Sequence, residues 1–248
     1  MRWGAMHVFF LLVDEPFYTP ACLEPLLDRW HGSIVGAAFP RGFFDWSRLK
    51  SSLQLYGMIG TLARAVKVGC AAITGGAVHR RFATRGIPTF DVDEVNAPAF
   101  LDTLRRLNTD LVVSLNCPQK LGQGLLTLPA HGCINVHFGK LPKYRGILPI
   151  FHAILNGDSS FGVTVHLMDE KLDNGEIVAQ CDVPILSGDT LETLYPKGFS
   201  AASDLLDGAF HAFEEGRVVL RRNPEPEKTY YSYPSASMIR RYRRAVRR

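Results

Sequence analysis

Short apolar runs alternate along the chain with longer stretches whose apolar residues recur once per helical turn. Runs of about four to eight apolar residues indicate buried strands, and the one-turn spacing indicates one apolar helix face. The expected strands are Val8–Val13, Ser33–Ala38, Pro88–Phe90, Leu111–Leu115, Cys133–Phe138, Val163–Met168 and Glu176–Val183. The expected helices are Thr19–Trp30, Asp45–Lys67, Ala97–Leu107, Ile150–Leu155 and Leu191–Glu215. This alternation predicts an α/β, Rossmann-like domain with a mostly parallel sheet and helices on both faces.

Two of these elements carry more specific expectations. The strands at 163–168 and 176–183 are joined by a loop of about seven residues, which predicts a hairpin. The helix at 45–67 has two apolar stripes, one containing Trp46 and the other containing Leu62. One stripe can pack on the sheet, so we expect a homodimer interface or a substrate lid to cover the other.

Composition excludes several classes of protein. The 248 residues are 46% hydrophobic and only 21% charged, which excludes a disordered chain. The apolar run Val8–Val13 is far shorter than a membrane span of about 20 residues, so we expect no membrane span. The five cysteines are scattered and form no C-x-x-C pair, which favours a reducing cytoplasm over disulfides or structural zinc. No cluster of potential ligands has metal spacing, and we expect no metal.

The net charge of +4 is concentrated at the C-terminus. The last eleven residues contain six arginines and no acidic residue, and removing these charges leaves −2 for the rest of the chain. A basic tail can contact nucleic acid or an anionic surface. We expect instead an irregular, solubilising tail, and nucleic acid is not the expected partner.

The expected strand at 133–138 places two polar side chains together. Asn135 and His137 point to one face of the strand, while Ile134, Val136 and Phe138 point to the other. The carboxyl end of such a strand is where open α/β sheets bind ligands. An isolated Asn-x-His pair is more often a hydrogen-bonded polar pair at a strand end, so the pair alone does not establish a site.

The residues that follow form a longer pattern. The run 135–146 combines Asn135-Val136-His137 with Leu141-Pro142 and Tyr144-Arg145-Gly146, and a second run covers 162–169 and 172–175. The two runs resemble the signatures of the folate-dependent formyltransferases, which include methionyl-tRNA formyltransferase, glycinamide ribonucleotide transformylase and the sugar N-formyltransferases. The resemblance covers roughly residues 85–190. The chain departs from it at Gly139, where the tRNA enzymes usually have Ser, and at Lys140, where the family usually has Leu.

The resemblance implies a reaction and three catalytic residues. In this family a formyl group moves from the N10 nitrogen of 10-formyltetrahydrofolate to an amine through a tetrahedral oxyanion. The resemblance assigns Asn135, His137 and Asp173 to catalysis. An amide N–H and an imidazolium can stabilise the oxyanion, and a neighbouring carboxylate favours the protonated form of the imidazole. His137 can also carry the amine proton to the leaving folate nitrogen.

Further contacts are expected on the same basis. The expected folate contacts are Asn116, Cys117, Pro118, Gln119, Gly139, Lys140, Leu141, Pro142 and Asp169. Tyr144 and Arg145 are expected to bind the acceptor, although a structural role for Arg145 is an open alternative. Cys117 has no basic neighbour to activate its thiol and is expected to line the site. His166 alternates with apolar residues and is interpreted as a structural histidine.

The sequence therefore predicts an N-formyltransferase with a small-molecule amine acceptor, such as an amino sugar nucleotide. Residues 1–185 are expected to form the catalytic domain, and 186–248 a C-terminal helix with a short basic extension. Initiator tRNA is disfavoured because methionyl-tRNA formyltransferases carry a β-rich domain after the catalytic one, and only about sixty residues follow Ile185 here. The alternatives are a methionyl-tRNA formyltransferase-like enzyme, a formyltetrahydrofolate hydrolase and a non-catalytic folate-binding or interaction protein.

Overall fold

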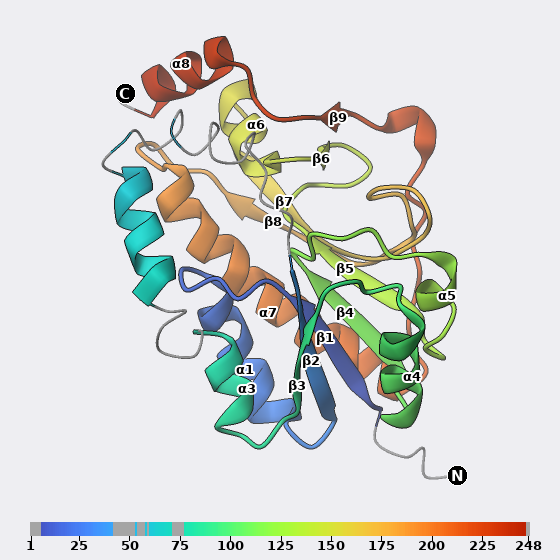
Figure 1. The fold of residues 1–248 in the computed structure, drawn as a ribbon. Helices are drawn as coiled ribbons and strands as arrows, with labels where there is room; N and C mark the ends of the chain where they lie inside the picture. Colours follow the sequence, from blue (N-terminus) through green and yellow to red (C-terminus); the bar gives the residue numbers. More distant parts are fainter. Residues whose placement is uncertain (1–5, 42–52, 54–57, 59, 71–76, 247–248) are drawn as a thin grey trace.

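The computed structural model describes residues 6–41, 53, 58, 60–70 and 77–246. Its main sheet has seven strands in the order β3-β2-β1-β4-β5-β7-β8 (Figure 1). The strands are β1 Val8–Leu12, β2 Ile34–Pro40, β3 Thr89–Val92, β4 Leu111–Leu115, β5 Cys133–His137, β7 Ser160–Leu167 and β8 Ile177–Pro184. The first five strands run parallel, whereas β7 and β8 are antiparallel and form the expected hairpin.

Helices cover both faces of this sheet, as expected. Besides the helical residues 60–70, the described helices are α1 Thr19–Trp30, α3 His79–Ala83, α4 Pro98–Arg106, α5 Gln123–Leu126, α6 Pro149–Asn156, α7 Leu191–Glu214 and α8 Ala236–Ala245. Strand β1 shows how the two layers arise. Phe10 packs into a core shared with α1, α3 and α7, while the adjacent Phe9 packs into the core beneath α4 and α5. The α/β fold with a mostly parallel sheet is confirmed.

Strand β5 obeys the alternation expected from its sequence. Ile134 and Val136 are buried in the core shared with α7, so Asn135 and His137 lie on the opposite face of the strand. Strand β5 also joins the two parts of the sheet, because it pairs parallel with β4 and antiparallel with β7. Its polar residues therefore lie where parallel strands meet the hairpin.

The expectation of an irregular C-terminal tail is wrong. After α7 the chain forms the short strand β9 Tyr230–Tyr231, which pairs with β6 Arg145–Gly146, and then the helix α8. Ile239 and Tyr242 are buried, and the Tyr242 hydroxyl accepts a 3.0 Å hydrogen bond from the Leu191 backbone N–H. These contacts hold the helix against the rest of the fold. They are possible because Ile239 and Tyr242 lie on the same apolar face of the helix. Four of its arginines, 240, 241, 243 and 244, are exposed.

The expected helix at 45–67 lies largely outside the described residues. Residues 60–70 are helical, and Met58, Leu62 and Val66 are exposed. The homodimer interface or lid assigned to this helix stays a prediction, as does the domain boundary at residue 185. Within the part of the chain that the structure describes, no helix has the length and apolar character needed to cross a bilayer.

Candidate active site

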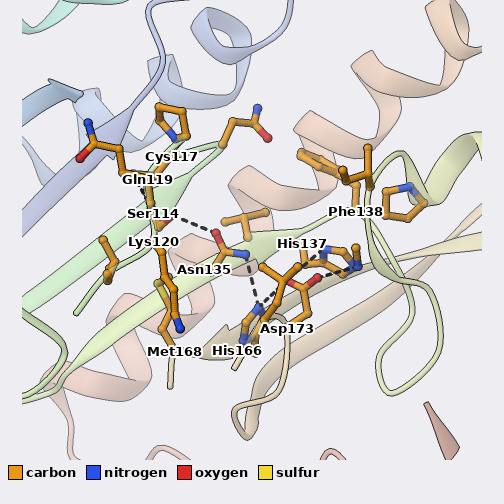
Figure 2. Close-up of a pocket in the computed structure, with 18 of the residues that line it drawn as sticks. Ser114, Cys117, Gln119, Lys120, Asn135, His137, Phe138, His166, Met168 and Asp173 are labelled. Atoms are coloured by element: carbon orange, nitrogen blue, oxygen red, sulfur yellow. Dashed lines mark hydrogen bonds and ion pairs between the residues drawn. The ribbon is translucent and has the colours of Figure 1, made fainter. Parts of the chain in front are cut away.

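A cavity of about 780 Å³ opens at the carboxyl ends of β4 and β5. Figure 2 shows the polar side chains that meet in it. Asn135 and His137 come from β5, His166 from β7, and Asp173 from the loop between β7 and β8. The three residues expected to be catalytic are thus brought together by separate segments of the fold.

The amide of Asn135 is oriented by two neighbours. The Ser114 hydroxyl donates a 2.9 Å hydrogen bond to its Oδ1, and its Nδ2 donates to His166 Nε2 over 3.3 Å. A side-chain amide has two N–H groups. One is used by His166, so the other remains for a group bound in the cavity.

His166, interpreted from the sequence as a structural histidine, is buried and hydrogen-bonded beside Asn135. It lies opposite Asn135 in the β5–β7 pair, and burial, followed by the charge of His137, lowers its pKa to about 4. The ring is therefore neutral at pH 7. Its Nδ1 donates to the Leu167 carbonyl over 2.7 Å, which leaves Nε2 as the acceptor for Asn135. The alternating sequence of β7 placed His166 on a strand, but only the strand register brought it to Asn135.

Neutral His166 makes folding pH-dependent, and we expect this to be measurable. Its pKa in the folded protein lies below that of a free imidazole, so the unfolded chain binds more protons between about pH 6.5 and 4. Above this window His166 is neutral in both the folded and the unfolded chain and does not lower the free energy of unfolding. As the pH falls through the window, the unfolded chain takes up the proton first, so the free energy of unfolding decreases. We expect the free energy of unfolding, measured with urea, to change less between pH 7 and pH 5 in His166→Gln than in the unmodified chain. Equal changes would contradict this.

His137 and Asp173 form a buried pair. His137 Nε2 donates to the Tyr144 carbonyl over 2.7 Å, while Nδ1 lies 3.6 Å from Asp173 Oδ1. The carboxylate thus faces the ring nitrogen that is not committed to Tyr144. The 3.6 Å separation is an ion-pair distance and exceeds that of a hydrogen bond.

The loop that carries Asp173 is held in an unusual backbone conformation. Asp173 has a φ of +50° and its Oδ2 accepts a 2.8 Å hydrogen bond from the Gly146 N–H. Asn116, Tyr144 and Leu148 also have positive φ values. Non-glycine residues adopt this region at an energetic cost, and such residues cluster at functional sites. Here they belong to the segments that surround the cavity, whereas Asn108, which also has a positive φ, lies before β4 and outside the cavity.

His137 and Tyr144 leave no room for a side chain at residue 139, which is a glycine. A Cβ atom at residue 139 would lie 2.6 Å from His137 Nε2 and 2.7 Å from the Tyr144 carbonyl oxygen. Both separations are shorter than a van der Waals contact. The hydrogen bond between His137 and Tyr144 therefore occupies the space that a larger residue would need, which accounts for glycine at this departure from the family pattern.

The expected folate contacts divide into two groups. Asn116, Cys117, Pro118, Gln119 and Asp169 line the cavity. Burial raises the pKa of the Cys117 thiol to about 11, so this side chain is an uncharged part of the wall.

Residues 139–142 are not among the lining residues, in contrast to the expectation. The Gly139 carbonyl accepts from Thr164 Oγ1 over 2.6 Å, and Lys140 Nζ pairs with Asp182 over 2.6 Å. The side chain of Leu141 is buried. Gly139, Lys140 and Leu141 thus pack against the β7–β8 hairpin, and Pro142 also lies outside the lining.

Tyr144 and Arg145 also point away from the cavity. The Tyr144 ring stacks on Tyr231 and its hydroxyl donates to Asp158. Arg145 is 3% exposed, and its guanidinium donates to Asn174, Glu225 and Asn223. The structural alternative considered for Arg145 agrees with these contacts, and acceptor binding through its guanidinium does not.

Several lining residues were not expected from the sequence. They are Glu15 before α1, Leu148 before α6, Tyr195 in α7 and Tyr233 before α8. Except for Leu148, each comes from a segment remote in sequence from β5, so only the tertiary fold identifies it. No group of three potential ligands among the described residues is arranged to hold a metal ion.

Comparisons with known proteins agree on one family. A family model described as formyl transferase matches residues 71–208, more than half of the chain. A methionyl-tRNA formyltransferase of Halothermothrix orenii is 40% identical over 148 residues, which are 60% of this chain and 46% of the relative. The chain spans about half the length of the curated relatives it matches.

Solved structures share the fold at lower identity. Glycinamide ribonucleotide transformylase 1 from Symbiobacterium toebii has a TM-score of 0.66 and 20% identity, covering 90% of this chain and 96% of its own. A sugar N-formyltransferase from Shewanella sp FDAARGOS_354 has a TM-score of 0.60 and 20% identity, with coverage of 92% and 77%. At this identity the likeness concerns the fold.

Proposed function

The chain belongs to the formyl transferase family, and from this premise we propose that it transfers a formyl group from 10-formyltetrahydrofolate to a primary amine. The observation that carries the proposal is the meeting of Asn135, His137 and Asp173 in one cavity. Each has a partner that fixes its orientation: Ser114 for Asn135, the Tyr144 carbonyl for His137 and the Gly146 N–H for Asp173.

The three side chains have distinct roles in this reaction. The amine nitrogen attacks the formyl carbon, the bond from that carbon to the folate nitrogen breaks, and the amine proton passes to that nitrogen. The free N–H of Asn135 stabilises the negative oxygen that develops during the attack. His137 lies beside it as an imidazolium: Nδ1 gives its proton to the departing folate nitrogen and takes up the amine proton in exchange, because Nε2 is committed to Tyr144. Asp173 holds His137 in its charged form.

The cavity fits a folate-sized donor. Its volume of about 780 Å³ lies within the usual range for small-molecule sites, roughly 300–1,000 Å³. Asn116 to Gln119 form one wall and Asp169 to Leu172 another, and these segments would hold the pterin part of the donor beside Asn135. The donor supplies the formyl group and the leaving nitrogen.

We propose a small amine as the acceptor, with an amino sugar nucleotide as the leading example. The charge distribution supports this choice, because the chain without its terminal arginines has a net charge of −2. Binding a large nucleic acid requires a broad positive surface that neutralises many phosphates.

Methionyl-tRNA is the second candidate. One observation that favours it is the 40% identity to a methionyl-tRNA formyltransferase. A second is helix α8, which holds its exposed arginines in a fixed arrangement. A folded basic helix can orient a polyanion better than the irregular tail expected from the sequence.

Product analysis separates these candidates. Purified protein is incubated with 10-formyltetrahydrofolate and a panel of amines that includes amino sugar nucleotides and charged initiator tRNA. We expect mass spectrometry to show one added formyl group on a small amine, little formyl-methionyl-tRNA, and the same acceptor preference after the exposed arginines 240, 241, 243 and 244 are changed to glutamine, which keeps the buried Ile239 and Tyr242 of α8. Efficient formylation of tRNA that is lost with these substitutions would establish the second candidate. Formate release without any formylated amine would identify a hydrolase.

A further inference from the structure

Residues 221–231, which we call the C-terminal strap, lie against both loops that hold the catalytic pair. The strap follows α7 and lies beyond residue 208, where the match to the family model ends. At one end, Arg221 exchanges two backbone hydrogen bonds with Ile177 of β8. At the other, β9 pairs with β6, and Figure 1 shows the two strands side by side. The strap thus joins the loop of Asp173 to the turn at 144–146.

Within the strap, Asn223 makes direct contact with the Asp173 loop. Its Nδ2 donates to the carbonyl oxygens of Asp173 and Gly175, each over 3.0 Å. Its Oδ1 accepts a 3.0 Å hydrogen bond from the Arg145 guanidinium. Both N–H groups and the oxygen of the amide are therefore used, which fixes its orientation.

These contacts act on the residue whose backbone is strained. Asp173 has a φ of +50°, a conformation that an L-residue keeps only when its surroundings hold it. Asn223 binds the carbonyl of Asp173 itself and that of Gly175, two residues further along. On the other side of the residue, the Gly146 N–H binds the carboxylate. The other carboxylate oxygen, Oδ1, faces two imidazole rings and lies 3.6 Å from His137 Nδ1 and 3.8 Å from His166 Nε2.

We propose that Asn223 is a positioning residue for formyl transfer, because it sets the Asp173 carboxylate beside His137 from a segment outside the family match. This inference rests on the proposed function of Asn135, His137 and Asp173. Asn223 itself is not among the cavity-lining residues around His137 and acts through Asp173.

Two substitutions of Asn223 test whether this residue positions Asp173 or only supports the Arg145 side chain. Asn223→Asp keeps the size of the side chain and can still accept from Arg145, whose charge offsets the new carboxylate, but it has no N–H for the Asp173 and Gly175 carbonyls. Asn223→Ala removes both contacts. Arg222→Gln, at the exposed neighbouring position, is the matched control.

We expect both Asn223 variants to lower kcat about tenfold or more, with the KM for 10-formyltetrahydrofolate within about twofold, whereas Arg222→Gln leaves both unchanged. Since Asn223 acts through Asp173, the double variant Asn223→Asp/Asp173→Asn should be no slower than Asp173→Asn alone. Unchanged kcat in Asn223→Asp, or additive losses in the double variant, would overturn the proposal.

A second readout does not depend on turnover. In the ¹⁵N NMR spectrum of the full chain at pH 7, we expect the His137 ring signals of Asn223→Asp to shift toward those of Asp173→Asn. Unshifted signals in a folded Asn223→Asp would refute the positioning role even if activity fell. If the unmodified chain formylates no amine, the proposed function fails, while the NMR comparison still decides whether Asn223 places Asp173.

Discussion

Replacing Asn135, His137 or Asp173 by alanine is expected to lower formyl transfer at least about a hundredfold in each case. Asn135→Ala removes the N–H that faces the developing negative oxygen. His137→Ala removes the ring that carries the positive charge and the moving proton, and Asp173→Ala removes the carboxylate 3.6 Å from that ring. Single-turnover rates with a verified acceptor measure the effect on the chemical step.

These losses should arise without unfolding. None of the three side chains belongs to the hydrophobic cores on either face of the sheet. Asp182→Asn, which alters only the exposed pair with Lys140, is a suitable control. In Asp173→Asn, the His137 ring signals in the imidazole NMR spectrum should shift, because the carboxylate 3.6 Å from Nδ1 is lost. Near-normal turnover in any two of the three alanine variants would refute the catalytic assignment.

Gly139→Ala is expected to lower turnover roughly tenfold to a hundredfold, although it adds a single methyl group. The added Cβ would lie 2.6 Å from His137 Nε2, so the hydrogen bond from His137 to Tyr144 must break or move. A hydrogen bond to a charged group contributes about 1.5–3 kcal/mol, and about 1.4 kcal/mol corresponds to tenfold in rate. Gly139→Ser should be at least as slow.

The control for this prediction is Gly208→Ala within α7, where an added Cβ meets no atom within 4 Å. It should leave turnover unchanged and, as an alanine in a helix, should not destabilise the protein. Thermal unfolding of Gly139→Ala tests whether the loss is local. A Gly139→Ser variant with full activity would show that His137 does not need its hydrogen bond to Tyr144.

The sequence determined the layers of the fold and part of the site. Helix α1 and strand β4 begin and end at the expected residues, because uninterrupted apolar periodicity is a local property of the chain. The placement of Asn135 and His137 on one face of β5 followed from strand geometry alone. The grouping of these two residues with Asp173 came from the resemblance to a family, and the structure brings the three to one cavity.

Only the tertiary structure decided which neighbours orient those groups. His166 reaches Asn135 through the register of β5 and β7, and Asn223 reaches Asp173 from fifty residues away. Arg145 is turned from the cavity by Asn223 and Glu225, partners that its own motif does not contain. Periodicity in a sequence specifies which face of an element is buried. It does not specify which remote polar groups will meet there, because these contacts depend on strand register and on the path of the C-terminal strap.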